Sequence, residues 1–199
     1  MMTYDMHGLW DRDNKWTGPF LNAHTNLTEI KEAMDLVWRN DISSKKIVLG
    51  VGFYGRAFTA TDKSCMRPGC TFKDAANGGN CTREPGILMN SEIEDILAQR
   101  KIAPTLDREA AVKIASWDDQ WVAYDDSQTF QLKADYARSQ CMSGLMVWAI
   151  SHDNPNATNT LAFGAAVGRK GTAWTRKGGD IVVKVPIPQC KWTACGEGR

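Results

Sequence analysis

MMTYDMHGLW, residues 1–10, places a short apolar run directly before a cluster of aromatic and polar side chains. Two later stretches repeat this pattern. Residues 47–53, IVLGVGF, run into YGR, and residues 144–150, GLMVWAI, run into SHDN. Apolar runs of this length are typical of strands buried on both faces of a parallel sheet, and in an α/β barrel the chemistry gathers where such strands end. The chain therefore predicts three barrel strands whose polar and aromatic ends meet at one rim.

Helical periodicity fills the spaces between these strands. Asn26 or Thr28 is a candidate cap for a helix that extends to about residue 39, with Glu29 in the capping-box position after Asn26. Ser127 starts a second helix, and a third begins near Asn156. Strands and helices that alternate in this order predict βα units and a parallel sheet.

The connection between the second strand and the second helix is too long for a simple crossover. It holds a Cys- and Gly-rich loop at 65–86, a helix capped by Ser91 with Glu94 in the capping-box position, and two β-like runs at 112–117 and 120–124. Long loops without structure of their own are uncommon, so we expect a small inserted α+β subdomain above the strand ends.

Composition argues against several classes of partner. The chain has 24 Lys and Arg against 23 Asp and Glu and no basic run, so we expect no nucleic acid. No apolar stretch reaches the roughly 18 residues of a membrane span. His7 and His152 have no Cys or Glu at ligand spacing, so we expect neither a metal nor another cofactor.

The cysteines match no common zinc or redox spacing. Three of them lie in the Gly-rich loop, where disulfides would compensate for the small apolar mass, so we expect at least one disulfide. The alternative is that some of the cysteines are plain buried thiols. Sequons that begin at Asn26, Asn80 and Asn156 agree with secretion, although no signal-peptide pattern is found. The six cysteines are Cys65, Cys70, Cys81, Cys141, Cys190 and Cys195.

The chain has 199 residues, whereas a complete eight-stranded barrel usually has about 250. With only three barrel-type strands, we expect an incomplete barrel that is poorly cooperative and prone to aggregation. Its open strand edges and the inward side chains Val48, Val51, Met146 and Val147 would face water and favour association.

The candidate site residues have plain interpretations when each is taken alone. Asp5 could be a turn residue, Trp148 a core residue and Arg56 a surface ion pair. Their common position at strand ends favours a site instead. Eight tryptophans against four tyrosines add an aromatic bias, and indole rings pack well on the apolar face of a pyranose. We therefore predict a carbohydrate cleft.

Three motifs resemble a known family. Residues 2–11, MTYDMHGLWD, resemble the MxYD segment on the sixth barrel strand of family 18 glycoside hydrolases. Residues 52–58, GFYGRAF, resemble the end of the seventh strand of that family, and residues 144–149, GLMVWA, resemble the eighth. Residues 58–125 are similar to the chitinase insertion domain, and the resemblance extends to about Gly168. The insertion and the tail look most like fungal chitinases related to killer-toxin subunits.

This resemblance implies the C-terminal part of a TIM (β/α)8 barrel, strands six to eight, with an inserted α+β chitinase insertion domain. It also implies an extracellular protein that acts on chitin or chitooligosaccharides and whose barrel is completed by a missing N-terminal half. The implied parts are strands six and seven at 1–57, the insertion domain at 58–126, a helix, strand eight and the final helix at 127–170, and a Cys-containing tail at 171–199.

The family hydrolyses β-1,4-linked N-acetylglucosamine with retention by substrate assistance, in which the sugar's own acetamido oxygen attacks the anomeric carbon. By resemblance, Tyr4 and Asp5 are the catalytic residues: Tyr4 holds the acetamido group and Asp5 supports the polar network. Trp148 would form the floor of the subsite. The other predicted substrate contacts are Tyr54, Arg56, Met2, His7 and Trp10.

The family's general acid is the last residue of a DxxDxDxE motif, and this motif occurs nowhere in the sequence. General acid catalysis typically supplies about 10²- to 10⁴-fold in rate, so we expect the chain alone to be inactive. Two functions stay open. The favoured one is the C-terminal portion of a secreted chitinase, and the alternative is a noncatalytic chitin-binding or toxin-subunit-like module.

Overall fold

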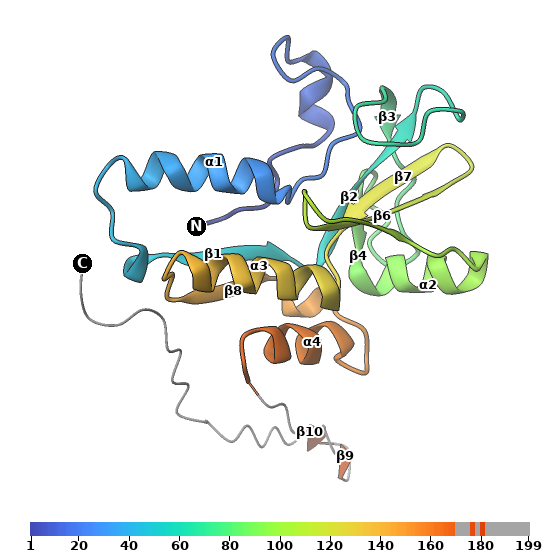
Figure 1. Ribbon diagram of the computed structural model, residues 1–199. Coiled ribbons are helices and arrows are strands. Elements are labelled where there is room, and N and C mark those ends of the chain that lie inside the picture. The colour runs from blue at the N-terminus through green and yellow to red at the C-terminus, as the bar shows by residue number, and fades with distance from the viewer. Residues whose placement is uncertain (170–175, 178–179, 182–199) are drawn as a thin grey trace.

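The computed structural model describes residues 1–169, 176–177 and 180–181. Most of the predicted tail, including Cys190 and Cys195, lies outside these residues. The described part is a mixed α/β fold with a parallel strand pair and, apart from it, a six-stranded antiparallel sheet (Figure 1). A short antiparallel pair, β9 (Arg176–Lys177) and β10 (Asp180–Ile181), follows. No closed barrel is formed by the described residues, and none of their helices is long and apolar enough to cross a membrane.

The parallel pair confirms the second and third predicted strands. β1 (Val48–Gly52) and β8 (Gly144–Trp148) run side by side, with Gly52 opposite Trp148. The third strand ends earlier than predicted, because residues 150–152 turn into the short 3-10 helix η3 (Ile150–His152). Another short 3-10 helix, η2 (Ser44–Lys46), leads into β1.

Three predicted helices are confirmed, and they cover one face of the parallel pair. These are α1 (Leu27–Trp38), α3 (Ser127–Ser139) and α4 (Thr158–Ala166). Leu49 packs among side chains of α1 and α3, whereas Val51 and Phe53 pack against α3 and α4. The apolar residues of β1 that alternate toward the helices therefore make the core of this half of the molecule.

The prediction that all four inward side chains of the strands face water is partly wrong. Successive side chains of a strand point to opposite faces, so Val48 and Val51 cannot lie on the same one. Val51 is fully buried under the helices, and Val147 packs against the same cluster. Val48 is 37% exposed and lies, with Met146, on the face that the helices do not cover.

The first predicted strand is not formed as a strand. Met1 makes two ladder-like bonds to β1, since its amino group donates to the Val48 carbonyl at 2.9 Å and its carbonyl accepts from Gly50 N at 2.9 Å. The next ladder position is taken by a side chain, because the Thr3 hydroxyl donates to the Gly50 carbonyl at 2.5 Å. The backbone therefore leaves the sheet at Thr3 and turns away at Asp5.

The antiparallel sheet has the strand order β3-β2-β7-β6-β5, with β4 paired to β2. The two β-like runs were predicted correctly, as β6 (Val112–Trp117) and β7 (Gln120–Tyr124). The Cys-rich loop contains a strand that the sequence did not suggest, β3, and the expected disulfide, Cys65–Cys70. The other four strands of the sheet are β2 (Tyr54–Ala60), β3 (Phe72–Ala75), β4 (Ile87–Met89) and β5 (Thr105–Asp107).

The helix of this region, α2 (Asn90–Arg100), begins one residue before the predicted cap. Glu92 rather than Glu94 closes the first turn, where its carboxylate accepts from Met89 N at 2.9 Å. Glu94 instead reaches α4 and accepts from the side-chain amide of Asn159 at 2.7 Å. The predicted pair of Ser91 and Glu94 is therefore not the cap.

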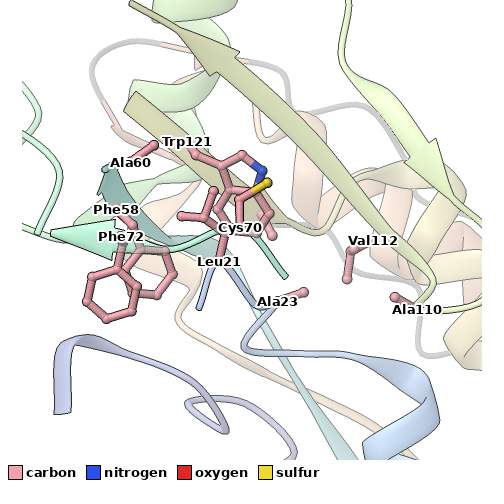
Figure 2. Close-up of a cluster of buried hydrophobic side chains, with 10 residues drawn as sticks. Leu21, Ala23, Phe58, Ala60, Cys70, Phe72, Ala110, Val112 and Trp121 are labelled. Atoms are coloured by element: carbon pink, nitrogen blue, oxygen red, sulfur yellow. The ribbon is translucent and has the colours of Figure 1, made fainter. Parts of the chain in front are cut away.

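A buried cluster joins the loop that follows residues 1–10 to the antiparallel sheet. Figure 2 shows Leu21 and Cys70 beside Trp121, and the rings of Phe58 and Phe72 stack at 4.6 Å. The backbone supports this contact, since Leu21 N donates to the Cys70 carbonyl at 2.7 Å. The segment that carries the candidate site is thus fixed to both sheets.

We expect the isolated chain to associate through the uncovered face of β1 and β8. Val48→Lys should reduce this association because it places a charge on the apolar face, as sedimentation velocity at two concentrations would show. Leu36→Lys is a matched control, since Leu36 is 56% exposed but lies on α1. A monomeric chain that unfolds in one sharp transition and binds little hydrophobic dye would contradict this expectation.

Candidate functional site

One carboxylate oxygen gathers the predicted site. The Oδ1 atom of Asp5 accepts from the Tyr54 hydroxyl at 2.7 Å and from Arg56 Nε at 2.8 Å. The ring of Tyr4 lies edge-on to that of Tyr54, with centroids 6.3 Å apart. Four of the predicted site residues therefore meet in one cluster, although they come from segments about fifty residues apart.

Tyr54 and Arg56 stand on a strand and not on the exit loop that the sequence suggested. Both belong to β2, where Tyr54 pairs with Met89 and Arg56 pairs with Ile87 on one side and Ala123 on the other. Residues two apart in a strand share a face, so both side chains point to Asp5. Between them, a Cβ on Gly55 would lie 2.7 Å from the Ala123 carbonyl, so the close pairing with β7 requires glycine.

These contacts determine which side chains of the cluster are ionised. Burial alone would raise the pKa of Asp5, but the contacts of its carboxylate with His24, Arg56 and the Tyr54 hydroxyl, together with the charge of Arg56, outweigh it and hold that pKa far below its usual range. Burial and the Asp5 carboxylate raise the pKa of the Tyr54 hydroxyl. At neutral pH the site thus holds an aspartate anion and a neutral tyrosine that donates to it.

Trp10 forms one wall of this cluster. It belongs to the short 3-10 helix η1 (Leu9–Asp13), and its ring lies 4.8 Å from the guanidinium carbon of Arg56. A guanidinium at this distance from an indole is held by cation–π attraction. Trp10 remains 49% exposed, so its ring is also open to a ligand.

Trp148 lies at the end of β8, and it is 57% exposed. The strand register puts it beside Gly52, and the Phe53 amide donates to its carbonyl at 2.8 Å. The Tyr4 ring covers β1 on the same face, since a Cβ on Gly50 would lie 3.0 Å from it. Met2 is 73% exposed and makes no polar contact in the described part of the chain.

Two polar atoms of the cluster are left for a ligand. Within the residues that the structure describes, neither the Oδ2 atom of Asp5 nor the hydroxyl of Tyr4 has a hydrogen-bond partner. The side chain of Asp5 is 36% exposed, so solvent or a ligand can reach it. The arrangement can therefore bind one polar group between an anion and a hydroxyl, beside exposed indole rings.

Residues 1–153 match the sequence profile of Glycosyl hydrolases family 18. The chain belongs to this family. The match includes Tyr4, Asp5, Tyr54, Arg56 and Trp148.

The relatives include chitinases and proteins related to them. Secreted chitinase LysM12 of Penicillium expansum is 32% identical in an alignment 163 residues long that covers 74% of this chain and 11% of the chitinase. Killer toxin subunits alpha/beta of Kluyveromyces lactis are 28% identical over 153 residues, 76% of this chain and 13% of the toxin protein. The human pseudo-chitinase YKL-39 has the same fold, with a TM-score of 0.73 at 21% identity over 84% of this chain and 50% of its own. The family 18 chain thus spans only part of each of these relatives.

His7, a predicted substrate contact, is placed elsewhere. It is buried, and its Nδ1 lies 2.7 Å from an Asp11 oxygen while its Nε2 lies 2.9 Å from a Glu29 oxygen. Burial opposes a charge on this ring, but the hydrogen bonds and charges of Glu29 and Asp11 outweigh it and raise the pKa of His7. The ring therefore ties η1 to α1 and has no free nitrogen for a sugar.

The contact between His7 and Glu29 also explains why the predicted capping box of α1 is not formed. Asn26 caps α1 by accepting from Thr28 N at 2.9 Å, as predicted. Glu29 does not complete the capping box, because its carboxylate is held by His7.

No group of three or more His, Cys, Asp and Glu side chains in the described residues could hold a metal ion.

One residue of the site, His24, was not predicted from the sequence. His24 is fully buried beneath Asp5 and Tyr54, and its ring centroid lies 4.8 Å from that of Tyr54. It lies on an irregular segment before α1, where neither periodicity nor spacing marks it. The only sequence signal available was its residue type, since histidine is scarce in this chain.

Arg56→Gln should raise the pKa of Asp5 by about 1–3, because it removes the cation nearest to the carboxylate. The pKa can be followed by carbon-13 NMR of the aspartate carboxyl groups during an acid titration. Arg100→Gln is a matched control, since Arg100 pairs with Asp118 at 2.8 Å on an exposed surface. An Asp5 carboxyl that titrates in its ordinary range in the unaltered chain would show that the pair with Arg56 is not formed.

Proposed function

We propose that this chain forms the part of a chitinase site that binds N-acetylglucosamine units and orients the acetamido group during retaining, substrate-assisted hydrolysis of β-1,4 linkages. The observation that carries the proposal is the cluster on Asp5. Its Oδ1 is fixed by Tyr54 and Arg56, while its Oδ2 and the Tyr4 hydroxyl stay available. The proposed parent protein is a TIM-barrel chitinase that carries an insertion domain, and this chain is its C-terminal portion.

The acetamido group suits the two available atoms. Its N–H is a donor that a carboxylate oxygen accepts, and its carbonyl is an acceptor for a tyrosine hydroxyl. A group held at both ends is fixed in orientation, so its carbonyl oxygen can be aimed at the anomeric carbon. The ionised Asp5 carboxylate would also stabilise the positive charge that develops on the closing ring.

The exposed indole of Trp148 is the proposed floor under the sugar. Aromatic faces pack on the apolar face of a pyranose, and the position of Trp148 beside Gly52 puts it on the same face as Tyr4. Arg56 and Trp10 are the proposed contacts to neighbouring substituents. Met2 is exposed and is a further proposed contact.

The proposed general acid is outside this chain, since the 199 residues hold no DxxDxDxE motif. Glu92 does not substitute for it. Burial alone would raise the pKa of Glu92, but backbone N–H groups of Thr82, Met89 and Cys81 outweigh it and lower that pKa. A general acid requires the opposite shift.

A noncatalytic binding module is the second candidate. It is favoured by the likeness to YKL-39, which is described as a pseudo-chitinase with retained chitooligosaccharide binding properties. Such a module needs the platform of Trp148 and the Asp5 cluster but no acid. The likeness to the killer toxin subunits fits the same candidate.

We also propose that the protein works outside the cell. One relative is named a secreted chitinase, and the Cys65–Cys70 disulfide is of the kind that persists in oxidising compartments.

The chain should bind chitotetraose but release no product from a chitooligosaccharide reporter. Trp148→Ala should weaken the binding by roughly tenfold to a hundredfold, about 1.4–2.8 kcal/mol, as measured by calorimetry. Trp148→Phe is the matched control, because it keeps an aromatic face and should retain most of the affinity. Turnover by the 199-residue chain would show that it contains its own acid, and absence of any sugar binding would contradict both candidates.

In a longer family 18 protein that joins this chain to a half with the DxxDxDxE motif, Tyr4→Phe should lower kcat more than it raises KM. The hydroxyl matters most when the acetamido oxygen closes on the anomeric carbon, so its loss affects the transition state more than the bound ground state. Steady-state kinetics would separate the two effects. Full turnover by Tyr4→Phe would show that the hydroxyl has no such role.

A further inference from the structure

His24 connects the backbones that carry Asp5 and Tyr54. Its Nε2 lies 3.1 Å from the Tyr54 carbonyl oxygen, and its Nδ1 lies 3.3 Å from the Asp5 amide nitrogen. The side chain is fully buried, and the His24 carbonyl accepts from Met6 N at 3.1 Å. The ring therefore lies directly under the proposed catalytic group without reaching solvent.

These two contacts fix the form of the ring. The Tyr54 carbonyl can only accept, so Nε2 must carry a proton. The Asp5 amide can only donate, so Nδ1 must be bare. Only the neutral tautomer with its proton on Nε2 satisfies both partners.

Burial of His24 outweighs the effect of the carboxylates around it. The Asp5 carboxylate lies 3.6 Å from Nδ1, and the buried ion pair of Asp125 and Lys133 lies beneath, where Lys133 also donates to Thr25 at 3.1 Å. Burial lowers the pKa of His24 despite the two carboxylates. Asp125 and Lys133 oppose one another, so neither imposes a charge on the ring.

The bond to Nδ1 supports an unusual backbone. Asp5 has a φ of +60°, a left-handed conformation that residues other than glycine rarely adopt. The hydrogen bond from its amide to His24 stabilises this turn, which directs the carboxylate toward Tyr54 and Arg56.

We propose that His24 is a positioning residue of this site, which acts as a buried acceptor for the Asp5 amide and so holds the Asp5 carboxylate in its working orientation. The role of that carboxylate toward the sugar rests on the function proposed above. The role of His24 toward Asp5 does not depend on it.

The first test needs no substitution. The chain has three histidines, so selective nitrogen-15 labelling gives a small spectrum in which two-bond couplings distinguish the tautomers. We expect His24 as the Nε2–H tautomer at pH 7. An Nδ1–H tautomer or an imidazolium at that pH would overturn the proposal.

Two variants then test the roles of the two ring nitrogens of His24 separately. In His24→Asn, the side-chain oxygen can take the place of Nδ1 and accept from Asp5. In His24→Gln, the side-chain amide can take the place of Nε2 and bind Tyr54 but leaves the Asp5 amide without an acceptor. We expect His24→Gln to weaken chitotetraose binding by about tenfold, the factor for one lost hydrogen bond, and to raise the pKa of Asp5, whereas His24→Asn should stay within about threefold of the unaltered chain.

Equal losses in the two variants, or no loss in either, would overturn the proposal, because a packing role does not distinguish the two nitrogens. If the unaltered chain binds no chitotetraose, the proposed function fails. The tautomer of His24 and the pKa of Asp5 in the two variants still decide the role of His24 in that case.

Discussion

The double hydrogen bond on one oxygen of Asp5 is the interaction on which the site depends. It joins a turn near the start of the chain to a strand of the antiparallel sheet, through Tyr54 and Arg56. A carboxylate that accepts from a cation and a hydroxyl is fixed in orientation as well as charge. Because β2 follows β1 after a single residue, the same bond also links the start of the chain to the end of the parallel pair, where Trp148 lies opposite Gly52.

Beneath this bond lies a second, fully buried layer of charge. Lys133 on α3 pairs with Asp125 and donates to Thr25, and both charged side chains are completely buried. Removal of one member of such a pair typically costs about 3–5 kcal/mol, because the other charge is left without compensation. The layer ties α3 to the segment that carries His24, so the support under Asp5 is itself held by the core of the parallel half.

The sequence predicted those parts of the structure that repeat or follow a local rule. Apolar runs located β1 and β8, and β-like runs located β6 and β7, because burial and pleat leave a regular pattern. Prediction from the sequence failed where a residue distant in the chain determines the contacts of a side chain. Glu29 has the local spacing of a capping box but binds His7, and His24 lies 19 residues from Asp5 on a segment without periodicity.

The environment of Asp5 also decides which role in the proposed reaction it can take. Arg56 at 2.8 Å keeps the carboxylate ionised, which suits a group that orients the acetamido N–H and stabilises positive charge. A general acid must hold its proton near the working pH, which requires burial away from cations. One environment cannot both lower the pKa of a carboxyl group and raise it. In the proposed function, the acid of a complete site must therefore stand on an element out of reach of Arg56, so the group that orients the acetamido group and the group that donates the proton lie on separate parts of the fold.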